Sequence, residues 1–134
     1  MSLRHIQVGA GSTMGGAEPV IADAVRCGDL LFLSGRAPVD PATLQVVGAT
    51  FAEQAQIVLR DIGAVLAAAG SDWDHVVRIE CFLADAGDFA EWNQVWAQRF
   101  RPPRPARTTV VAGFAVPGIL IELQVTAAIG EGGA

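Results

Sequence analysis

Apolar residues recur at intervals of three and four over residues 50–70, the spacing of one face of an α-helix. Thr50 and Glu53 match a capping box at the start of this stretch, and Gly70 follows its last apolar position. The pattern predicts a helix that packs one face against a sheet. The apolar positions of that face are Phe51, Ala55, Val58, Ile62, Val65 and Ala69.

A second helix is expected near residues 88–100. Asp88 and Glu91 have the spacing of another capping box, and the prolines at 102 and 103 stop the helix. Its apolar stripe consists of Phe89, Trp92, Trp96 and Phe100. Because no basic groove accompanies these rings, core or subunit interface is a better interpretation of the tryptophans than a platform for stacking bases.

Strand patterns occupy most of the remaining chain. Apolar and polar residues alternate over 76–83 and 119–128. A further strand is expected over 30–34, where residues 30–33 are continuously apolar, as in a strand covered on both faces. Shorter strands are expected at 5–8, 24–26 and 107–112, with residues 1–3 left aside. The order β-β-β-α-β-α-β-β predicts an α+β sandwich, a mostly antiparallel sheet with two helices on one face.

The last two strands, 107–112 and 119–128, are expected to form a hairpin. If Ala112 lies opposite Ile119, then Thr109 faces Glu122 and Arg107 faces Gln124. This register is an assumption, since a slip of one residue moves every side chain to the other face. It predicts a polar cluster on one face of the sheet.

Two helices cover only one face of such a sheet. On the other face, the pattern places the mixed polar set Arg78, Glu80, Glu122 and Gln124. Charged residues make up only 17% of the chain, which is low for a small monomer and favours burial of surface between subunits. We therefore expect an oligomer.

Composition excludes several kinds of chemistry. The 134 residues fit a single domain, 1–134, and contain neither lysine nor tyrosine, so a Schiff-base lysine and a tyrosine acid are both impossible. A net charge of −5 disfavours nonspecific nucleic-acid binding. Two histidines cannot build a three-histidine zinc site, and no metal or other cofactor is expected. Cys27 and Cys81 stand alone, and no apolar run reaches membrane-spanning length, so we expect a cytoplasmic protein.

Three further features have simple structural interpretations. The glycine-rich stretch 9–15 lacks the following helix and the acidic residue of a dinucleotide-binding loop. His75 is expected in an exposed turn, and Arg101 and Arg104 in a solvated loop.

The predicted cluster of Arg107 and Glu122 leaves two interpretations open. The pair forms a structural ion pair, or Arg107 binds the carboxylate of a substrate through both arms of its guanidinium while Glu122 holds or deprotonates a water. The second arrangement hydrolyses or tautomerises a small carboxylate without a cofactor.

Three motifs in the right order resemble the RidA/YjgF family of reactive-intermediate deaminases, also known as L-PSP endoribonucleases. They are Ser34-Gly35 followed by Pro38 and Asp40-Pro41, the strand 76–83 with Asp88-Phe89 and Asn93, and Pro105-Ala106-Arg107-Thr108-Thr109 with Glu122 fifteen residues after the arginine. The resemblance covers about residues 20–128. Residues 1–19, the expected first strand and glycine-rich loop, lie outside it.

The resemblance implies a chorismate-mutase-like fold and a homotrimer with sites at the clefts between subunits. The implied reaction is hydrolysis of 2-imino and enamino acids to 2-keto acids and ammonia. By position, Arg107 binds the substrate carboxylate and Glu122 orients the attacking water. Ser34, Gly35, Thr109, Ile21 and Asn93 are the expected substrate-binding residues.

One departure affects the expected substrate. Ile21 occupies the position of a pocket tyrosine in many deaminase members, so the pocket is more apolar and a bulkier imino acid becomes a better candidate than aminoacrylate. The alternative is a noncatalytic protein of the same fold that binds small carboxylates for regulation. RNA cleavage is disfavoured, because the acidic chain offers poor phosphate binding.

Overall fold

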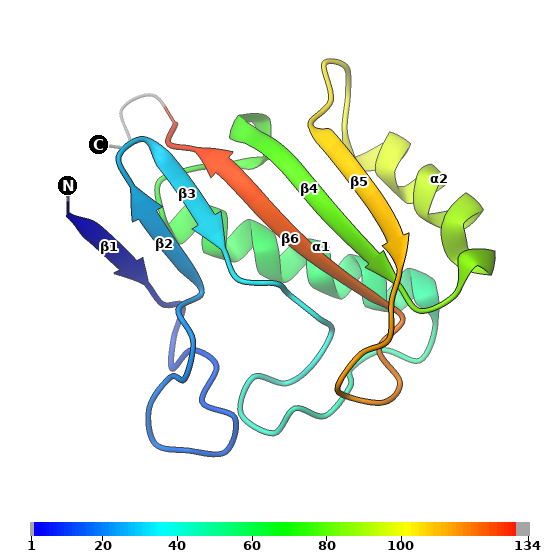
Figure 1. Cartoon of the computed structure of the whole chain (residues 1–134), viewed down its shortest axis with the longest axis horizontal. Coiled ribbons are helices and arrows are strands. Elements are labelled where there is room, and N and C mark those ends of the chain that lie inside the picture. The colour runs from blue at the N-terminus through cyan, green and yellow to red at the C-terminus, as the bar shows by residue number, and fades with distance from the viewer. Residues whose placement is uncertain (1, 131–134) are drawn as a thin grey trace.

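The computed structural model describes residues 2–130, which form one six-stranded sheet and two α-helices (Figure 1). Two short 3₁₀ turns, η1 (Trp73–His75) and η2 (Ala86–Asp88), precede β4 and α2. The remaining elements are β1 (Leu3–Ile6), β2 (Ala24–Cys27), β3 (Leu30–Leu33), α1 (Phe51–Ala68), β4 (Val76–Leu83), α2 (Phe89–Arg99), β5 (Ala106–Val111) and β6 (Ile121–Ala128). The predicted order of elements and the α+β class are confirmed, although β1 lies two residues earlier than expected and includes Leu3.

The strands follow the order β1-β2-β3-β6-β4-β5, and only β4 and β5 run parallel. The predicted hairpin between β5 and β6 is wrong, because β4 lies between them. Burial explains this outcome. The inward side chains of β6 are all buried, so it suits a position inside the sheet, whereas β5 is largely exposed and suits an edge.

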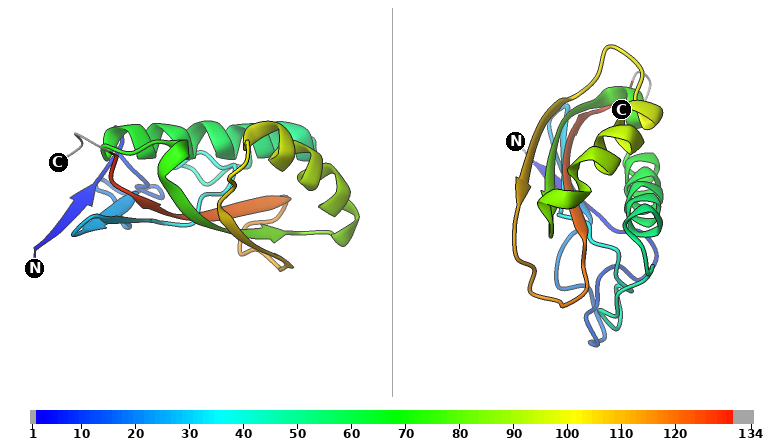
Figure 2. Two further views of the ribbon diagram at one scale, coloured as in Figure 1. Left: turned by 90° about the horizontal axis from the view of Figure 1, so that it is seen from above. Right: turned by 90° about the vertical axis from the view of Figure 1, so that its right-hand side faces the viewer.

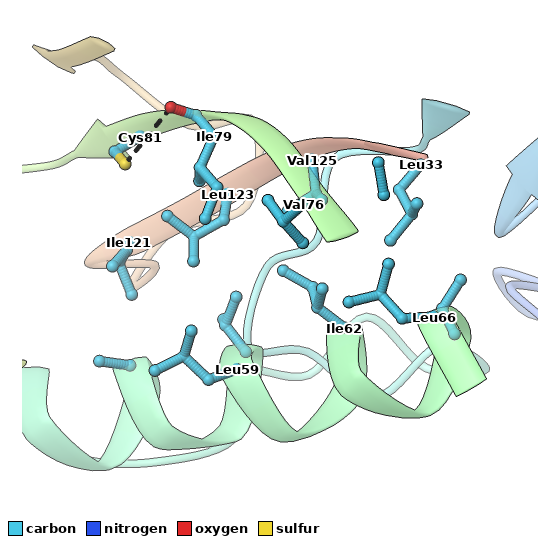
Figure 3. Packing of buried hydrophobic residues seen from close by; sticks show 14 of the residues in the cluster. Leu33, Leu59, Ile62, Leu66, Val76, Ile79, Cys81, Ile121, Leu123 and Val125 are labelled. Atoms are coloured by element: carbon cyan, nitrogen blue, oxygen red, sulfur yellow. Dashed lines mark hydrogen bonds between the residues drawn. The ribbon is translucent and has the colours of Figure 1, made fainter. Parts of the chain in front are cut away.

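Both helices lie on one side of the sheet, as predicted (Figure 2). At the start of α1, the Thr50 hydroxyl accepts a hydrogen bond from the backbone N–H of Glu53 at 3.2 Å, and the Glu53 carboxylate accepts one from Ala49 at 3.3 Å. The predicted cap at Thr50 is therefore confirmed, although the Glu53 carboxylate binds the backbone N–H one residue before the cap. The core fills the space between α1 and the sheet, with side chains from β3, β4 and β6 meeting the helix (Figure 3).

The second capping box is not formed. Asp88 makes no hydrogen bond to the start of α2, because the chain is already turning through η2. Instead, the Asp85 carboxylate accepts a hydrogen bond from Gly87 N–H at 2.8 Å. Trp92 and Trp96 are buried as expected, but Phe89 is 44% exposed at the first turn of the helix.

The other side of the sheet is bare (Figure 2). The register places Arg78, Glu80, Glu122 and Gln124 there, as predicted, and Arg78 Nε lies 3.5 Å from Glu80 Oε1. The same face carries the exposed apolar side chains of Leu3, Leu30, Phe32 and Val110. Within residues 2–130, neither helix combines the length and apolar character needed to span a bilayer.

We expect Ile62→Ala to lower the free energy of unfolding by about 2–5 kcal/mol, because it leaves a cavity in the core. Ile62 is only 1% exposed. The matched control is Gln56→Ala on the exposed side of the same helix, which should change stability by less than about 0.5 kcal/mol. Urea unfolding followed by circular dichroism measures both, and equal effects would contradict the position assigned to the core.

Candidate functional site

Arg107 and Thr109 lie at the edge of the sheet and point toward the helices. Strand β5 pairs in parallel with β4, which sets Arg107 beside Ile79 and Thr109 beside Cys81. Neighbouring residues in register share a face, and both Ile79 and Cys81 belong to the core under the helices. The fold therefore fixes Arg107 on the helix side of the edge strand.

The Arg107 guanidinium rests on two aromatic rings of α2. Its central carbon lies 5.0 Å from the Trp96 ring centroid and 5.7 Å from that of Phe89, both within cation–π range. Asn93 lies between these rings on the same helix face, since it follows Phe89 by four residues and precedes Trp96 by three. Within residues 2–130, no carboxylate approaches Arg107 within 4.0 Å.

A small group of buried polar atoms lies beside Arg107. Burial raises the pKa of the Cys81 thiol to about 11, while Thr109, Trp92 and the charge of Arg107 oppose this increase. The Thr109 hydroxyl and the Trp92 indole N–H are fully buried, and both act on the Cys81 sulfur as hydrogen-bonding groups that favour its thiolate.

Glu122 lies on the bare face of the sheet, opposite Phe82. Its carboxylate covers the backbone of Gly35, where an added Cβ would lie only 2.6 Å from Oε2, so a larger residue at this position would displace the carboxylate. Glu122 is half-buried, and this burial raises the pKa of its carboxyl group. Within residues 2–130, no basic side chain forms an ion pair with it.

Backbone hydrogen bonds hold the segment after β3 beside Glu122. Arg36 and Leu123 exchange two backbone hydrogen bonds, of 2.8 and 3.0 Å, which place Gly35 against β6. The Ser34 hydroxyl donates to the carbonyl of Ala22 at 2.6 Å, so it positions the neighbouring segment. Ile21 directly precedes Ala22 in that segment and is partly exposed.

Ile21, Ser34 and Gly35 line one small cavity of about 20 Å³. Its wall also contains the pair Asp23 and Arg36, with Arg36 Nη2 3.9 Å from Asp23 Oδ1. Asp23 is buried and accepts a hydrogen bond from the Val8 N–H at 2.8 Å. This pair was not anticipated, because a lone aspartate between two short strands gives no signal of burial in the sequence.

The predicted residues therefore form two groups. Ile21 and Ser34 line one cavity with Gly35, whose backbone lies against Glu122. Thr109 and Asn93 lie with Arg107. The expectation that Arg107 and Glu122 share one sheet face is wrong, because β4 separates their strands and the two side chains point to opposite faces. A structural ion pair between them is not formed within the chain.

The other candidate side chains stay apart from both groups. His75 lies in η1, where its Nδ1 is 2.6 Å from Asp72 Oδ1, and this hydrogen bond lowers the pKa of Asp72. Cys27 is half-buried in β2, so only Cys81 is a fully buried thiol. Over residues 2–130, no three histidine, cysteine or acidic side chains converge in a way that could hold a metal ion.

The chain is similar to known proteins of one family. Residues 17–129 match the family model described as Endoribonuclease L-PSP. A RutC family protein of Saccharolobus solfataricus is 42% identical over 106 residues, covering 79% of this chain and 84% of the relative. A YjgF family protein of Neisseria meningitidis superposes with a TM-score of 0.80 at 34% identity, over 97% of each chain. RidA from an Antarctic Psychrobacter gives a TM-score of 0.78 at 29% identity, over 94% of this chain and 99% of that one.

Proposed function

Because the chain belongs to the RidA/YjgF family, whose model is described as Endoribonuclease L-PSP, we propose that it is a cofactor-independent deaminase. Its substrates are 2-imino and enamino acids, and its products are 2-keto acids and ammonia. Arg107 binds the substrate carboxylate, and Glu122 acts on the water that attacks the imine carbon.

One observation carries this proposal. The fold holds an arginine and a glutamate half-buried while giving neither an ion-pair partner within residues 2–130. Partly buried charges without partners cost free energy, so a ligand that completes them is favoured. The carboxylate of a substrate fits the forked guanidinium of Arg107. The Glu122 carboxylate, whose pKa is raised by burial, is suited to exchange protons with water.

The two groups meet when a second copy of the chain supplies one of them. Arg107 lies on the helix side of the β5 edge and Glu122 on the bare face, so a symmetric assembly is needed to bring them to one substrate. The exposed apolar side chains Phe32, Leu30 and Val110 give the bare face a surface suited to burial between subunits. We propose a homotrimer with one site in each cleft.

The reaction requires one water and no electron transfer. Glu122 takes a proton from the water as the water oxygen bonds to the imine carbon, the electron pair of the C=N bond moves to the nitrogen, and Glu122 passes the proton to that nitrogen. Glu122 then takes the hydroxyl proton of the resulting carbinolamine and gives it to the departing nitrogen. The C–N bond breaks, the C=O bond of the 2-keto acid forms, and ammonia leaves.

The first experiment measures imine hydrolysis directly. An amino-acid oxidase generates imino acids from several amino acids, and semicarbazide traps the imine that remains. We expect faster loss of imine with the wild type than with buffer alone. Because the partly exposed Ile21 offers an apolar contact, the leucine imine should be hydrolysed about 10-fold faster than the alanine imine. No acceleration with any imine would refute the proposed activity.

The rate should also depend on pH through Glu122. Burial raises the pKa of this carboxyl group, and only the deprotonated form accepts a proton from water. Activity is therefore expected to fall as the pH drops, and its midpoint should lie above the pKa of an exposed glutamate, near 4.3. The profile of kcat/KM against pH measures this, with Glu122→Gln as the control that should show no rate above buffer at any pH.

A noncatalytic carboxylate-binding protein is the second candidate, favoured by Ile21, which brings no hydroxyl to its cavity. The two candidates differ in one result. Tight binding of a 2-keto acid by calorimetry, without turnover across the imine panel, would establish binding in place of catalysis. Arg107 is expected to hold the carboxylate in both cases.

A further inference from the structure

A second cavity, of about 640 Å³, lies at the end of the sheet where β4 and β5 begin. The loop between α2 and β5 forms one wall and extends past the sheet at the top of Figure 1. Turn η1 forms the opposite wall. Arg99, Arg101 and Arg104 line this cavity, together with Trp73, Phe100 and Asp74. We call it the arginine cavity.

The charge around this cavity is unusual for the chain. The protein carries a net charge of −5, yet four of its nine arginines lie between residues 99 and 107. Within residues 2–130, the guanidinium groups of Arg99, Arg101 and Arg104 have no carboxylate within 4.0 Å, although Asp74 lines the same cavity. Three cations gathered without anionic partners favour a bound anion.

One of these arginines is already held in place. The Nε of Arg104 donates to the carbonyl of Phe100 at 3.0 Å, which fixes the base of its guanidinium. The two terminal nitrogens take no part in this bond, and they present the planar fork that suits a carboxylate or phosphate. Arg101 lies on the same loop, with prolines at 102 and 103 between the two arginines.

The floor of the cavity is aromatic. The rings of Trp73 and Phe100 meet edge to face with centroids 5.5 Å apart, and the Arg99 guanidinium carbon lies 4.7 Å from the Trp73 ring. Flat apolar groups pack well against such rings. An anion attached to a ring would therefore meet both the guanidinium groups and the aromatic floor.

The arginine cavity is distinct from the proposed deaminase site. Arg107 does not line it, and Trp96 separates the two, since its ring contacts Phe100 at 4.5 Å and supports Arg107 at 5.0 Å. We propose that the arginine cavity binds a small aromatic anion, a carboxylate or phosphate monoester carried on a ring. Arg101 and Arg104 bind the anionic group, and the partly exposed Trp73, which the buried Phe100 supports from below, contacts the ring.

Calorimetric titration of the wild type tests this with three probes, phenyl phosphate, 3-phenylpropionate and inorganic phosphate. We expect each aromatic anion to bind at least about 10-fold more tightly than inorganic phosphate, because only the aromatic anions contact the floor. The double variant Arg101→Ala/Arg104→Ala should weaken binding of both aromatic anions by at least about 10-fold. Phenyl phosphate and 3-phenylpropionate also show which anionic group the cavity prefers.

Two further variants locate the binding. Arg4→Ala removes an exposed arginine from β1, at the opposite edge of the sheet, and should leave binding unchanged. Arg107→Ala removes the proposed substrate-carboxylate site and should leave unchanged the binding that Arg101→Ala/Arg104→Ala weakens, because Arg107 lies outside the cavity. The proposal is overturned if the aromatic anions fail to bind, if the double variant binds them as the wild type does, or if Arg107→Ala abolishes binding.

Discussion

Replacing Arg107 by alanine is expected to lower kcat/KM for imine hydrolysis by at least about 100-fold, while the fold persists. Loss of one partner from a buried charged pair costs about 2–5 kcal/mol, and about 1.4 kcal/mol corresponds to a factor of ten in rate. Arg107 is the only basic residue among the predicted substrate-binding and catalytic positions, so no neighbour in that set can replace its charge. The assay is the semicarbazide trap with leucine imine.

Arg107 also packs on Trp96 and Phe89, so stability must be measured together with activity. Arg107→Lys keeps the positive charge but loses the planar guanidinium that binds a carboxylate through two N–H groups. We expect this variant to have only part of the wild-type rate. Arg4→Ala removes one positive charge from the far edge strand and should keep full activity. If Arg107→Ala were folded and as active as the wild type, the assignment of the carboxylate-binding residue would be wrong.

Mixing two inactive variants is expected to restore activity. Arg107→Ala and Glu122→Gln each remove one essential group, so homotrimers of either variant have no complete site. In mixed trimers, a site is complete when its arginine comes from one variant and its glutamate from the other, which random mixing gives in about a quarter of the sites. The two chains are refolded together, and their activity is compared with that of each variant refolded alone.

Activity returns only if each site takes its arginine and its glutamate from different subunits. If Arg107 and Glu122 served the same site from one chain, the mixture would stay inactive, because each chain would still lack one group. The matched control is a mixture of Arg107→Ala with the double variant Arg107→Ala/Glu122→Gln. No subunit in this mixture supplies the arginine, so no activity should return.

The helices and the faces of most strands could be predicted from the sequence, because those features depend on local spacing. Thr50 and Glu53 form the expected cap, and Ile62 and Val65 occupy the expected core face of α1. The predicted capping box at Asp88 is not formed, and the reason is also local. Asp85 had already started a tighter turn three residues earlier, and the pattern of apolar residues does not distinguish the two.

The site was harder to predict, because it depends on which strands are neighbours. The residues of the candidate site could be identified from their types and from the family motifs. Their arrangement could not, because alternation in β5 and β6 shows which side chains share a face along each strand but not that β4 lies between them. The separation of Arg107 from Glu122 follows from that single topological fact.

The position of β6 has a consequence for how the chain folds. This strand comes last in sequence but lies in the interior of the sheet, where it is the sole link between β1-β2-β3 and β4-β5. The contact between β3 and β6 joins residues 94 to 98 positions apart, and contacts of this range form slowly because the loop must close first. Until β6 inserts, β3 and β4 both expose unpaired backbone edges, which makes a nascent chain at that stage prone to aggregation.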